Sequence, residues 1–288
     1  MKFGLVLPTY GPDSSRSANI NTAQAAENLG FDSIWVTDHL ALPEEDSDRF
    51  GRIFESISLI SYLAGMTTQI KLGISAVVLP QRNPVEVAKM LATVDLLSGG
   101  RFILSAGVGW SSGEYFNLGQ NFSNRGKRMD EAVQILRLLW SGREVVSFKG
   151  NFYHFENLVL SPQPLQKGGP PIWIAGNSLA AVYRAARLGD GWHPSLKPLP
   201  KFLNDMKELR RLVGSRPFTV SMRITMPLPD VFLDNQDKKS PEDVLIDLLR
   251  AYQDAGLNMV VFDLYTRSQA DRENQMKTLI TTIAPALE

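Results

Sequence analysis

Short apolar runs alternate with segments of helical periodicity along almost the whole chain, and this alternation limits the possible folds more than any other feature of the sequence. The pattern is typical of repeated βα units around a parallel sheet. We predict eight strands, at residues 3–8, 33–37, 70–78, 102–108, 172–175, 191–193, 219–224 and 259–264. Eight such units predict an α/β fold of the (β/α)8 TIM-barrel type.

An open, doubly wound sheet is the main rival architecture. Such a sheet usually carries a G-x-G-x-x-G turn after its first strand. Here the turn reads PTYGP at residues 8–12, which is not that motif. We therefore expect one barrel domain over residues 1–288, with inserts at about 110–126, 142–171 and 227–240. The second insert alternates apolar and polar residues around 149–151, which predicts a β-hairpin.

The composition narrows the class of partner. Thirty basic and thirty acidic residues cancel, so no overall field favours nucleic acid or an anionic membrane. The chain has no cysteine, which excludes a thiolate nucleophile, a cysteine-ligated zinc and an iron–sulfur cluster. Met1-Lys2-Phe3 leads directly into an apolar strand rather than into the apolar region of a signal peptide. No stretch is apolar for long enough to span a bilayer. We expect a cytoplasmic protein that acts on a small molecule.

The segment WIAGNS at residues 173–178 runs from a buried strand into a helix at 179–188. Gly176 permits a tight turn, and Asn177 or Ser178 can cap the helix. Open amide groups and the helix dipole at such a position favour an anion, for example a phosphate. An ordinary capped helix after a strand explains the same residues, so the spacing alone leaves both interpretations open.

Active sites of βα barrels lie at the carboxyl ends of the strands. Asp38 and His39 follow the second strand, where a carboxylate beside an imidazole suits acid/base chemistry. The alternative is a capped turn with a satisfied histidine. His193 ends the sixth strand, either near the mouth of the barrel or packed against an aromatic wall.

Small residues follow two other strands. Ser75 and Ala76 would let a flat ring approach the third strand, and Gly107 and Gly109 permit close approach of a ligand to main-chain amides. A barrel corner that needs glycine is the alternative for the latter pair. The three histidines of the chain show no metal-ligand spacing. Few ionisable groups, many glycines and an anion cradle together indicate a site that holds a cofactor with its own reactivity.

Six motifs occur in order along the chain: SIWVTDH (33–39), LGISA (72–76), GVGW (107–110), RGKRMDE (125–131), GNS (176–178) and GDGWHP (189–194). In this order and spacing they resemble the bacterial luciferase-like monooxygenase superfamily, and most closely its branch of oxidoreductases that depend on the deazaflavin coenzyme F420. The resemblance covers most of the chain.

The resemblance implies a (β/α)8 barrel with insertions, often dimeric, in which a flavin or deazaflavin lies over the strand ends. It implies coenzyme F420 as cofactor, with FMN as the alternative. His39 would be the catalytic acid/base, and Ser75–Ala76 match the position of a non-prolyl cis peptide in the family. The cofactor contacts would be Asp38, Ser75, Ala76, Gly107, Gly109, Gly176, Asn177 and Ser178.

One departure from the family bears on the substrate. Its sugar-phosphate dehydrogenases have a glutamate after the second glycine of Gly-x-Gly, where this chain has Trp110. The change disfavours a sugar phosphate and favours an apolar or aromatic substrate. Glu114 is a candidate for a displaced acid, to which we do not assign that role. The pocket residues would be Tyr10, Leu79, Trp110, Tyr115 and His193.

The expected activity is hydride transfer between F420 and a small organic substrate. One alternative is an FMN-dependent monooxygenase that uses oxygen and reduced flavin from a separate reductase. Another is a flavin-binding barrel without catalysis. The resemblance also implies a homodimer. The sequence alone names neither the substrate nor the direction of hydride transfer.

Overall fold

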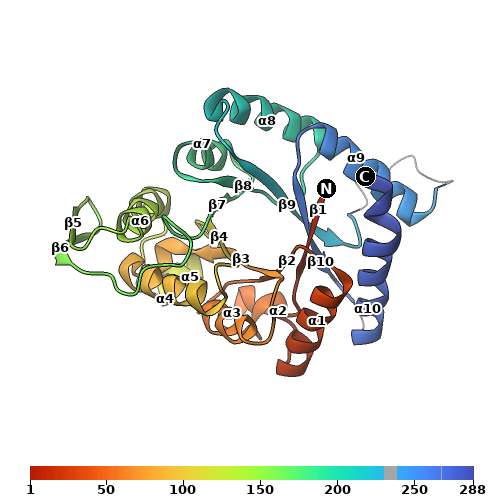
Figure 1. The fold of residues 1–288 in the computed structure, drawn as a ribbon, viewed down its shortest axis with the longest axis horizontal. Coiled ribbons are helices and arrows are strands. Elements are labelled where there is room, and N and C mark those ends of the chain that lie inside the picture. The colour runs from red at the N-terminus through yellow and green to blue at the C-terminus, as the bar shows by residue number, and fades with distance from the viewer. Residues whose placement is uncertain (230–238, 267) are drawn as a thin grey trace.

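The computed structural model of the chain describes residues 1–229, 239–266 and 268–288, and the backbone alone at residue 49. Parallel strands close into a barrel in the order β1-β10-β9-β8-β7-β4-β3-β2, with helices around it (Figure 1). The predicted TIM barrel is therefore confirmed. Most of the expected insert at 227–240 lies outside the described residues.

The eight barrel strands match the predicted ones to within two residues at each end. Pairing of Lys2 with Met259 closes the barrel between its first and last strands. The strands are β1 (Lys2–Val6), β2 (Ser33–Val36), β3 (Lys71–Val78), β4 (Phe102–Gly107), β7 (Ile172–Ala175), β8 (Gly191–His193), β9 (Thr219–Met226) and β10 (Met259–Leu264).

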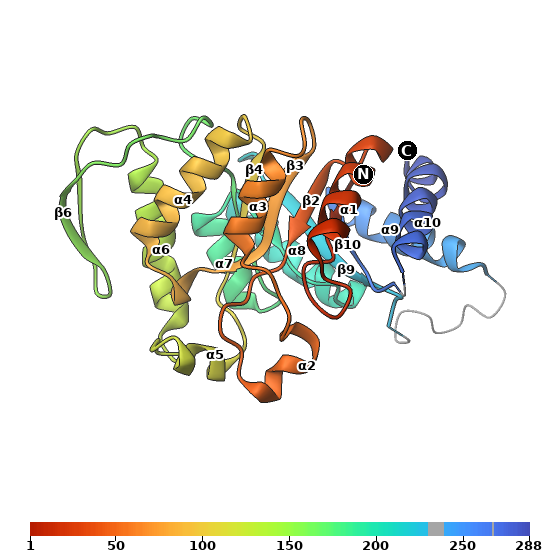
Figure 2. The ribbon, with the colours of Figure 1, turned by 90° about the horizontal axis from the view of Figure 1, so that it is seen from below.

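The longer helices surround the barrel, and short ones lie in its loops. The outer helices are α1 (Arg16–Leu29), α3 (Ser56–Ala64), α4 (Pro84–Leu97), α6 (Arg125–Leu139), α7 (Leu179–Leu188), α8 (Leu199–Val213), α9 (Pro241–Asp254) and α10 (Gln269–Thr278). The short ones are η1 (Glu44–Asp46), α2 (Ser47–Phe50), η2 (Leu79–Gln81), α5 (Ser112–Asn117), η4 (Leu279–Ile283) and η5 (Pro285–Leu287). Figure 2 shows α2 and α5 at the same end of the barrel, where Ser111 donates a hydrogen bond to Asp46.

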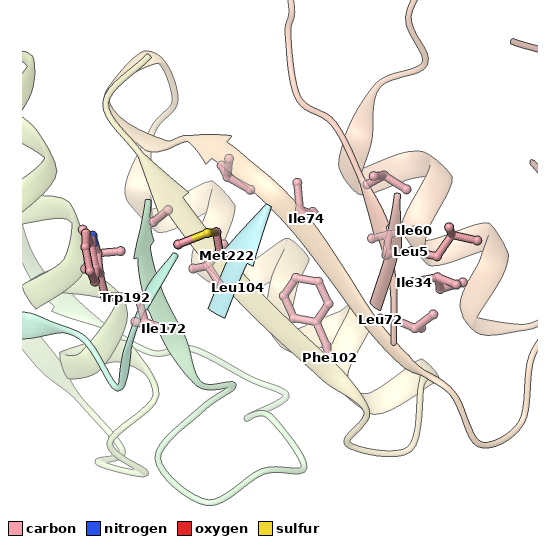
Figure 3. Packing of buried hydrophobic residues seen from close by; sticks show 14 of the residues in the cluster. Leu5, Ile34, Ile60, Leu72, Ile74, Phe102, Leu104, Ile172, Trp192 and Met222 are labelled. Atoms are coloured by element: carbon pink, nitrogen blue, oxygen red, sulfur yellow. The ribbon is translucent and has the colours of Figure 1, made fainter. Parts of the chain in front are cut away.

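Alternating side chains on the strands build two apolar layers. Inside the barrel, the Trp35 and Trp173 rings lie 5.3 Å apart, and Gly73 leaves the room that Trp35 occupies. Strand residues of opposite orientation, such as Ile34, Leu72 and Leu104, pack between the strands and the helices, where helix residues such as Ile60 belong to the same cluster (Figure 3). Burial of both faces explains why the strands read as continuous apolar runs.

The insert between α6 and β7 contains the predicted hairpin, formed by β5 (Val146–Lys149) and β6 (His154–Leu158). The hairpin projects on the side of α6, opposite α9 and α10 (Figure 1). The carboxylate of Glu131 in α6 accepts hydrogen bonds from the amides of Asn151 and Phe152, at 2.7 and 2.9 Å, so the turn is tied to the helix. In the part of the chain that is described, no helix has the length and apolar character needed to cross a membrane.

Candidate active site

A cavity of about 380 Å³ lies at the carboxyl ends of the barrel strands. This is the end at which TIM-barrel enzymes place their active sites. Seven of the strands and the loops that follow them contribute to its wall. The lining residues are Thr37, Asp38, His39, Phe50, Ser75, Ala76, Val78, Gly107, Val108, Gly109, Trp110, Ala175, Gly176, His193, Ser195, Arg223, Thr225 and Asp263.

The floor of the cavity is made of small residues. Ser75 and Ala76 are joined by a cis peptide bond, as the family resemblance implied for this position. A Cβ atom added to Gly107 would lie 3.3 Å from the Cβ of Ala76 and 3.6 Å from that of Ala175. Any larger side chain at Gly107 would therefore occupy the floor of the cavity.

His193 contacts this floor through the side chain of Ser75. Its Nε2 lies 2.8 Å from the Ser75 hydroxyl, and its Nδ1 lies 2.7 Å from the Ser221 hydroxyl. The ring stacks on Trp35 at 5.3 Å between centroids. Burial, with a smaller contribution from the positive charge of Arg223, lowers the pKa of His193 to about 3. The imidazole is therefore neutral at physiological pH and orients the Ser75 side chain.

Arg223 and Asp263 form an ion pair in the cavity wall that the sequence analysis did not identify. Arg223 Nη2 lies 2.7 Å from Asp263 Oδ2, and Nη1 donates to the carbonyl oxygen of Ser75 at 2.9 Å. The Tyr10 hydroxyl donates to Asp263 at 2.9 Å. Burial disfavours the charge on Arg223, but Asp263 and then Tyr10 raise the pKa of Arg223. The sequence feature that could have indicated this pair is a charged residue inside each of two apolar strands, β9 and β10.

A second buried pair lies on the other side of the cavity. Glu114 of α5 is fully buried, and its Oε2 lies 3.0 Å from Nδ1 of His39. Its Oε1 accepts a hydrogen bond from the Leu40 amide at 2.6 Å, and Gln81 Nε2 donates to Oε2 at 3.1 Å. Burial opposes ionisation, but these hydrogen bonds, with that of His39 the strongest, lower the pKa of Glu114 to about 2. Glu114 is therefore an ionised carboxylate that only accepts hydrogen bonds.

Aromatic rings surround His39 at the mouth of the cavity. Phe50 of α2 lies 4.9 Å from its ring, and Trp110 makes an edge contact at 5.7 Å. The Trp110 side chain is 53% exposed, although it lines the cavity. A partly exposed aromatic surface beside an imidazole suits an apolar or aromatic ligand.

The Asp38 carboxylate also lines the cavity, but its oxygens are bound to the protein. Oδ1 accepts from the Ser56 hydroxyl at 2.7 Å and from Arg82 Nη2 at 2.6 Å, while Oδ2 accepts from the Val78 amide at 2.9 Å. Asp38 thus connects the ends of β2 and β3 and holds Arg82. Its structural role in the wall is clear from these contacts.

The start of α7 lies at the rim of the cavity, since Gly176 lines it. Gly176 has φ of 129°, a conformation that L side chains rarely adopt. Ser178 caps α7 by accepting a hydrogen bond from the Ala181 amide, and Asn177 Oδ1 accepts from the Ser195 amide at 2.9 Å. The first turn of α7 contains no acidic residue, and Asn177 to Ala180 are exposed. An anion fits this helix terminus.

The structure brings together most of the residues expected at the site. Trp110 and His193 line the cavity with His39, whereas Tyr10 contacts the lining residues Asp263 and Phe50. Leu79 and Tyr115 are fully buried and do not line it. The described residues contain no cluster of three histidine, aspartate or glutamate side chains suited to a metal ion.

This barrel, with a cavity of small residues and an imidazole at its carboxyl end, has the architecture of an enzyme that binds a cofactor. The family model for luciferase-like monooxygenase matches residues 1–260. The chain therefore belongs to the luciferase-like monooxygenase family, whose members are oxidoreductases and monooxygenases.

Relatives in this family differ in cofactor. An FMNH2-dependent dimethylsulfone monooxygenase from Pseudomonas fluorescens is 37% identical over 178 residues, which is 61% of this chain and 46% of that protein. An F420-dependent hydroxymycolic acid dehydrogenase from Mycobacterium tuberculosis is 34% identical over 174 residues, which is 59% of this chain and 46% of the relative. The chain thus aligns with about half the length of each. Monooxygenase RslO1 from Streptomyces bottropensis has the same fold, with a TM-score of 0.82 at 20% identity over all of both chains.

Proposed function

We propose that this chain is an oxidoreductase that transfers a hydride between coenzyme F420 and a small apolar or aromatic substrate. The observation that carries the proposal is the floor of small residues around Ser75 and Ala76, which continues to the exposed start of α7. A tricyclic ring fits this floor, and a phosphate-bearing side chain fits the helix terminus. When bound, the cofactor supplies the hydride chemistry.

The residues of this chain would then bind and orient the reacting groups. Ser75, Ala76, Gly107 and Gly109 would contact the cofactor through their backbone, and Asp38 would hold the wall beside it. The amide groups around Gly176, Asn177 and Ser178 would hold the phosphate. His39 would transfer the proton that accompanies hydride transfer.

The substrate would lie between the cofactor and the aromatic mouth. Trp110 and Phe50 flank His39 there, so that wall offers apolar surface to a ligand. This arrangement supports an apolar or aromatic substrate rather than a sugar phosphate. The homodimer remains a prediction from the family resemblance.

An FMN-dependent monooxygenase is the second candidate, because the FMNH2-dependent relative is 37% identical. That activity would require oxygen and a reductase to supply reduced flavin. A flavin-binding barrel without catalysis is disfavoured by the His39–Glu114 pair, since such a protein has no need of a buried carboxylate against a cavity-lining imidazole.

Titration of the purified protein with F420 and, separately, with FMN tests the proposal by fluorescence. We expect F420 to bind more tightly, and Ser178→Asp to weaken its binding about tenfold or more, because aspartate keeps the cap but repels the phosphate. Ser240→Asp is the matched control, since Ser240 caps α9 in the same way, but no residue near it lines the cavity, whereas Gly176 lies in the lining two residues before Ser178. Binding of FMN alone would refute F420 as the cofactor and favour the second candidate, which substrate-dependent oxygen consumption would then have to show. If neither cofactor binds, or if Ser178→Asp has the affinity of the wild type, the proposal is wrong.

A further inference from the structure

We propose that Glu114 is a positioning residue that fixes His39 in the tautomer with hydrogen on Nδ1, so that Nε2 accepts a proton from a hydroxyl group of the substrate. Nothing in the sequence motifs assigns this role, because Glu114 lies four residues beyond Trp110 on a separate short helix. The tautomer of His39 is inferred from the structure alone, whereas the transfer of the substrate proton to His39 rests on the proposed function.

The hydrogen bond between the two side chains determines the tautomer. Glu114 is ionised and has no hydrogen to donate, so the 3.0 Å contact requires a hydrogen on Nδ1 of His39. A neutral imidazole carries only one N–H, so Nε2 then has a free lone pair. Among the described residues, no hydrogen-bond partner lies at Nε2, and the ring lines the cavity. Nε2 is therefore available to a ligand.

The orientation of the Glu114 carboxylate is fixed at both oxygens. Oε1 accepts from the backbone amides of Leu40 and Ala41, at 2.6 and 3.3 Å, and these groups can only donate. Oε2 accepts from His39 and from Gln81. The backbone of Glu114 is held in turn, because its amide donates to the Ser111 hydroxyl at 3.0 Å. The carboxylate cannot turn away from His39 without losing several of these bonds.

This geometry determines which group a substrate presents to His39. The lone pair on Nε2 accepts a hydrogen bond, so a hydroxyl group fits it as donor. When bound, a deazaflavin in its oxidised form would supply the acceptor for the hydride on the carbon that bears the hydroxyl. The O–H proton would pass to Nε2 of His39 as the C–O bond of the substrate becomes C=O. The imidazolium produced is stabilised by Glu114 and releases its proton to water at the open mouth.

The test is the tautomer of His39 in the protein without cofactor, measured from the ¹⁵N chemical shifts of the ring at a pH where it is neutral. His39→Gln identifies the signal among the three histidines. We expect hydrogen on Nδ1 in the wild type. In E114Q the two backbone amides require the amide oxygen at the Oε1 position, so the NH2 group faces Nδ1 and donates to it. The hydrogen of His39 should therefore move to Nε2.

Glu131→Gln is the matched control, because Glu131 is also buried and accepts backbone hydrogen bonds, but in the hairpin. It should leave the His39 tautomer unchanged. A merely structural role for Glu114 predicts lower stability in E114Q without a change of tautomer. Hydrogen on Nε2 in the wild type, or on Nδ1 in folded E114Q, would overturn the proposal. The wild-type measurement decides the matter even if E114Q does not fold. Failure to bind F420 would refute the proposed function and leave the tautomer result intact.

Discussion

The hollows at the two ends of the barrel differ in volume and in the polar side chains that line them. A hollow of about 920 Å³ at the amino ends of the strands is much larger than the cavity at the carboxyl ends. Yet its Arg101 donates to the carbonyl oxygens of Ala64 and Ile70, at 2.9 and 2.7 Å, and Asp190 accepts from the Ile172 amide. These charges hold loops together. At the other end, His39 faces open space, so the orientation of polar groups locates the site better than volume does.

The largest expected effect is at the floor of the carboxyl-end cavity. Gly107→Val should weaken binding of F420 about a hundredfold or more, because the added carbons occupy the space beside Ala76 and Ala175. Lys71→Ala, in the lining of the amino-end hollow, is the control and should bind as the wild type does. A fluorescence titration measures both. Equal affinities of the two variants for F420 would show that the two ends of the barrel do not differ in cofactor binding.

At the amino end, a substitution should lower stability and leave cofactor binding unchanged. Arg101→Leu should lower the free energy of unfolding by about 2 kcal/mol, because several carbonyl oxygens lose a charged donor. Its affinity for F420 should stay within about twofold of the wild type. Chemical denaturation and a cofactor titration check the two parts. A variant of full stability that fails to bind cofactor would contradict the account.

His39→Ala tests whether the carboxyl-end cavity is the site of catalysis. Turnover should fall about tenfold or more, because the proton acceptor is lost, while cofactor binding and fold persist. Steady-state rates with a substrate found by screening, together with circular dichroism, measure these effects. An unchanged rate would exclude His39 from the catalytic residues.

The most gradual effect is a pH dependence of stability that arises from a buried histidine of the cavity wall. The pKa of His193 is about 3 in the folded protein, against an ordinary value of 6.5, so between these values the unfolded chain binds the additional proton. The free energy of unfolding should therefore fall as pH decreases below 6.5, by at most about 1.4 kcal/mol per pH unit from this group.

His193→Asn should reduce that slope between pH 6.5 and pH 5. Glu114 contributes only at lower pH, because its pKa of about 2 lies below its ordinary value of 4.5 and its stabilisation is lost as pH falls between these values. Urea denaturation at several pH values measures the slope. An equal slope in the variant and the wild type would show that His193 is not the group responsible.

The sequence predicted the barrel well, because each strand is buried on both faces and is bounded by recognisable turns. It also predicted which segments meet at the carboxyl ends, including Ser75–Ala76 and the start of α7. It did not predict the partners of those residues. The contact of Glu114 with His39 depends on the direction of α5, and the Arg223–Asp263 pair joins neighbouring strands far apart in sequence. Leu79 and Tyr115 point into the core, a direction that spacing after a strand does not determine.

A crystal structure of the protein soaked with F420 tests the central claim most directly. The account predicts a tricyclic ring on the backbone of Ser75 and Ala76, with its phosphate at the amide groups of Gly176 to Ser178. A ring bound in the amino-end hollow, or a carboxyl-end cavity that stays empty under conditions where F420 binds in solution, would contradict it.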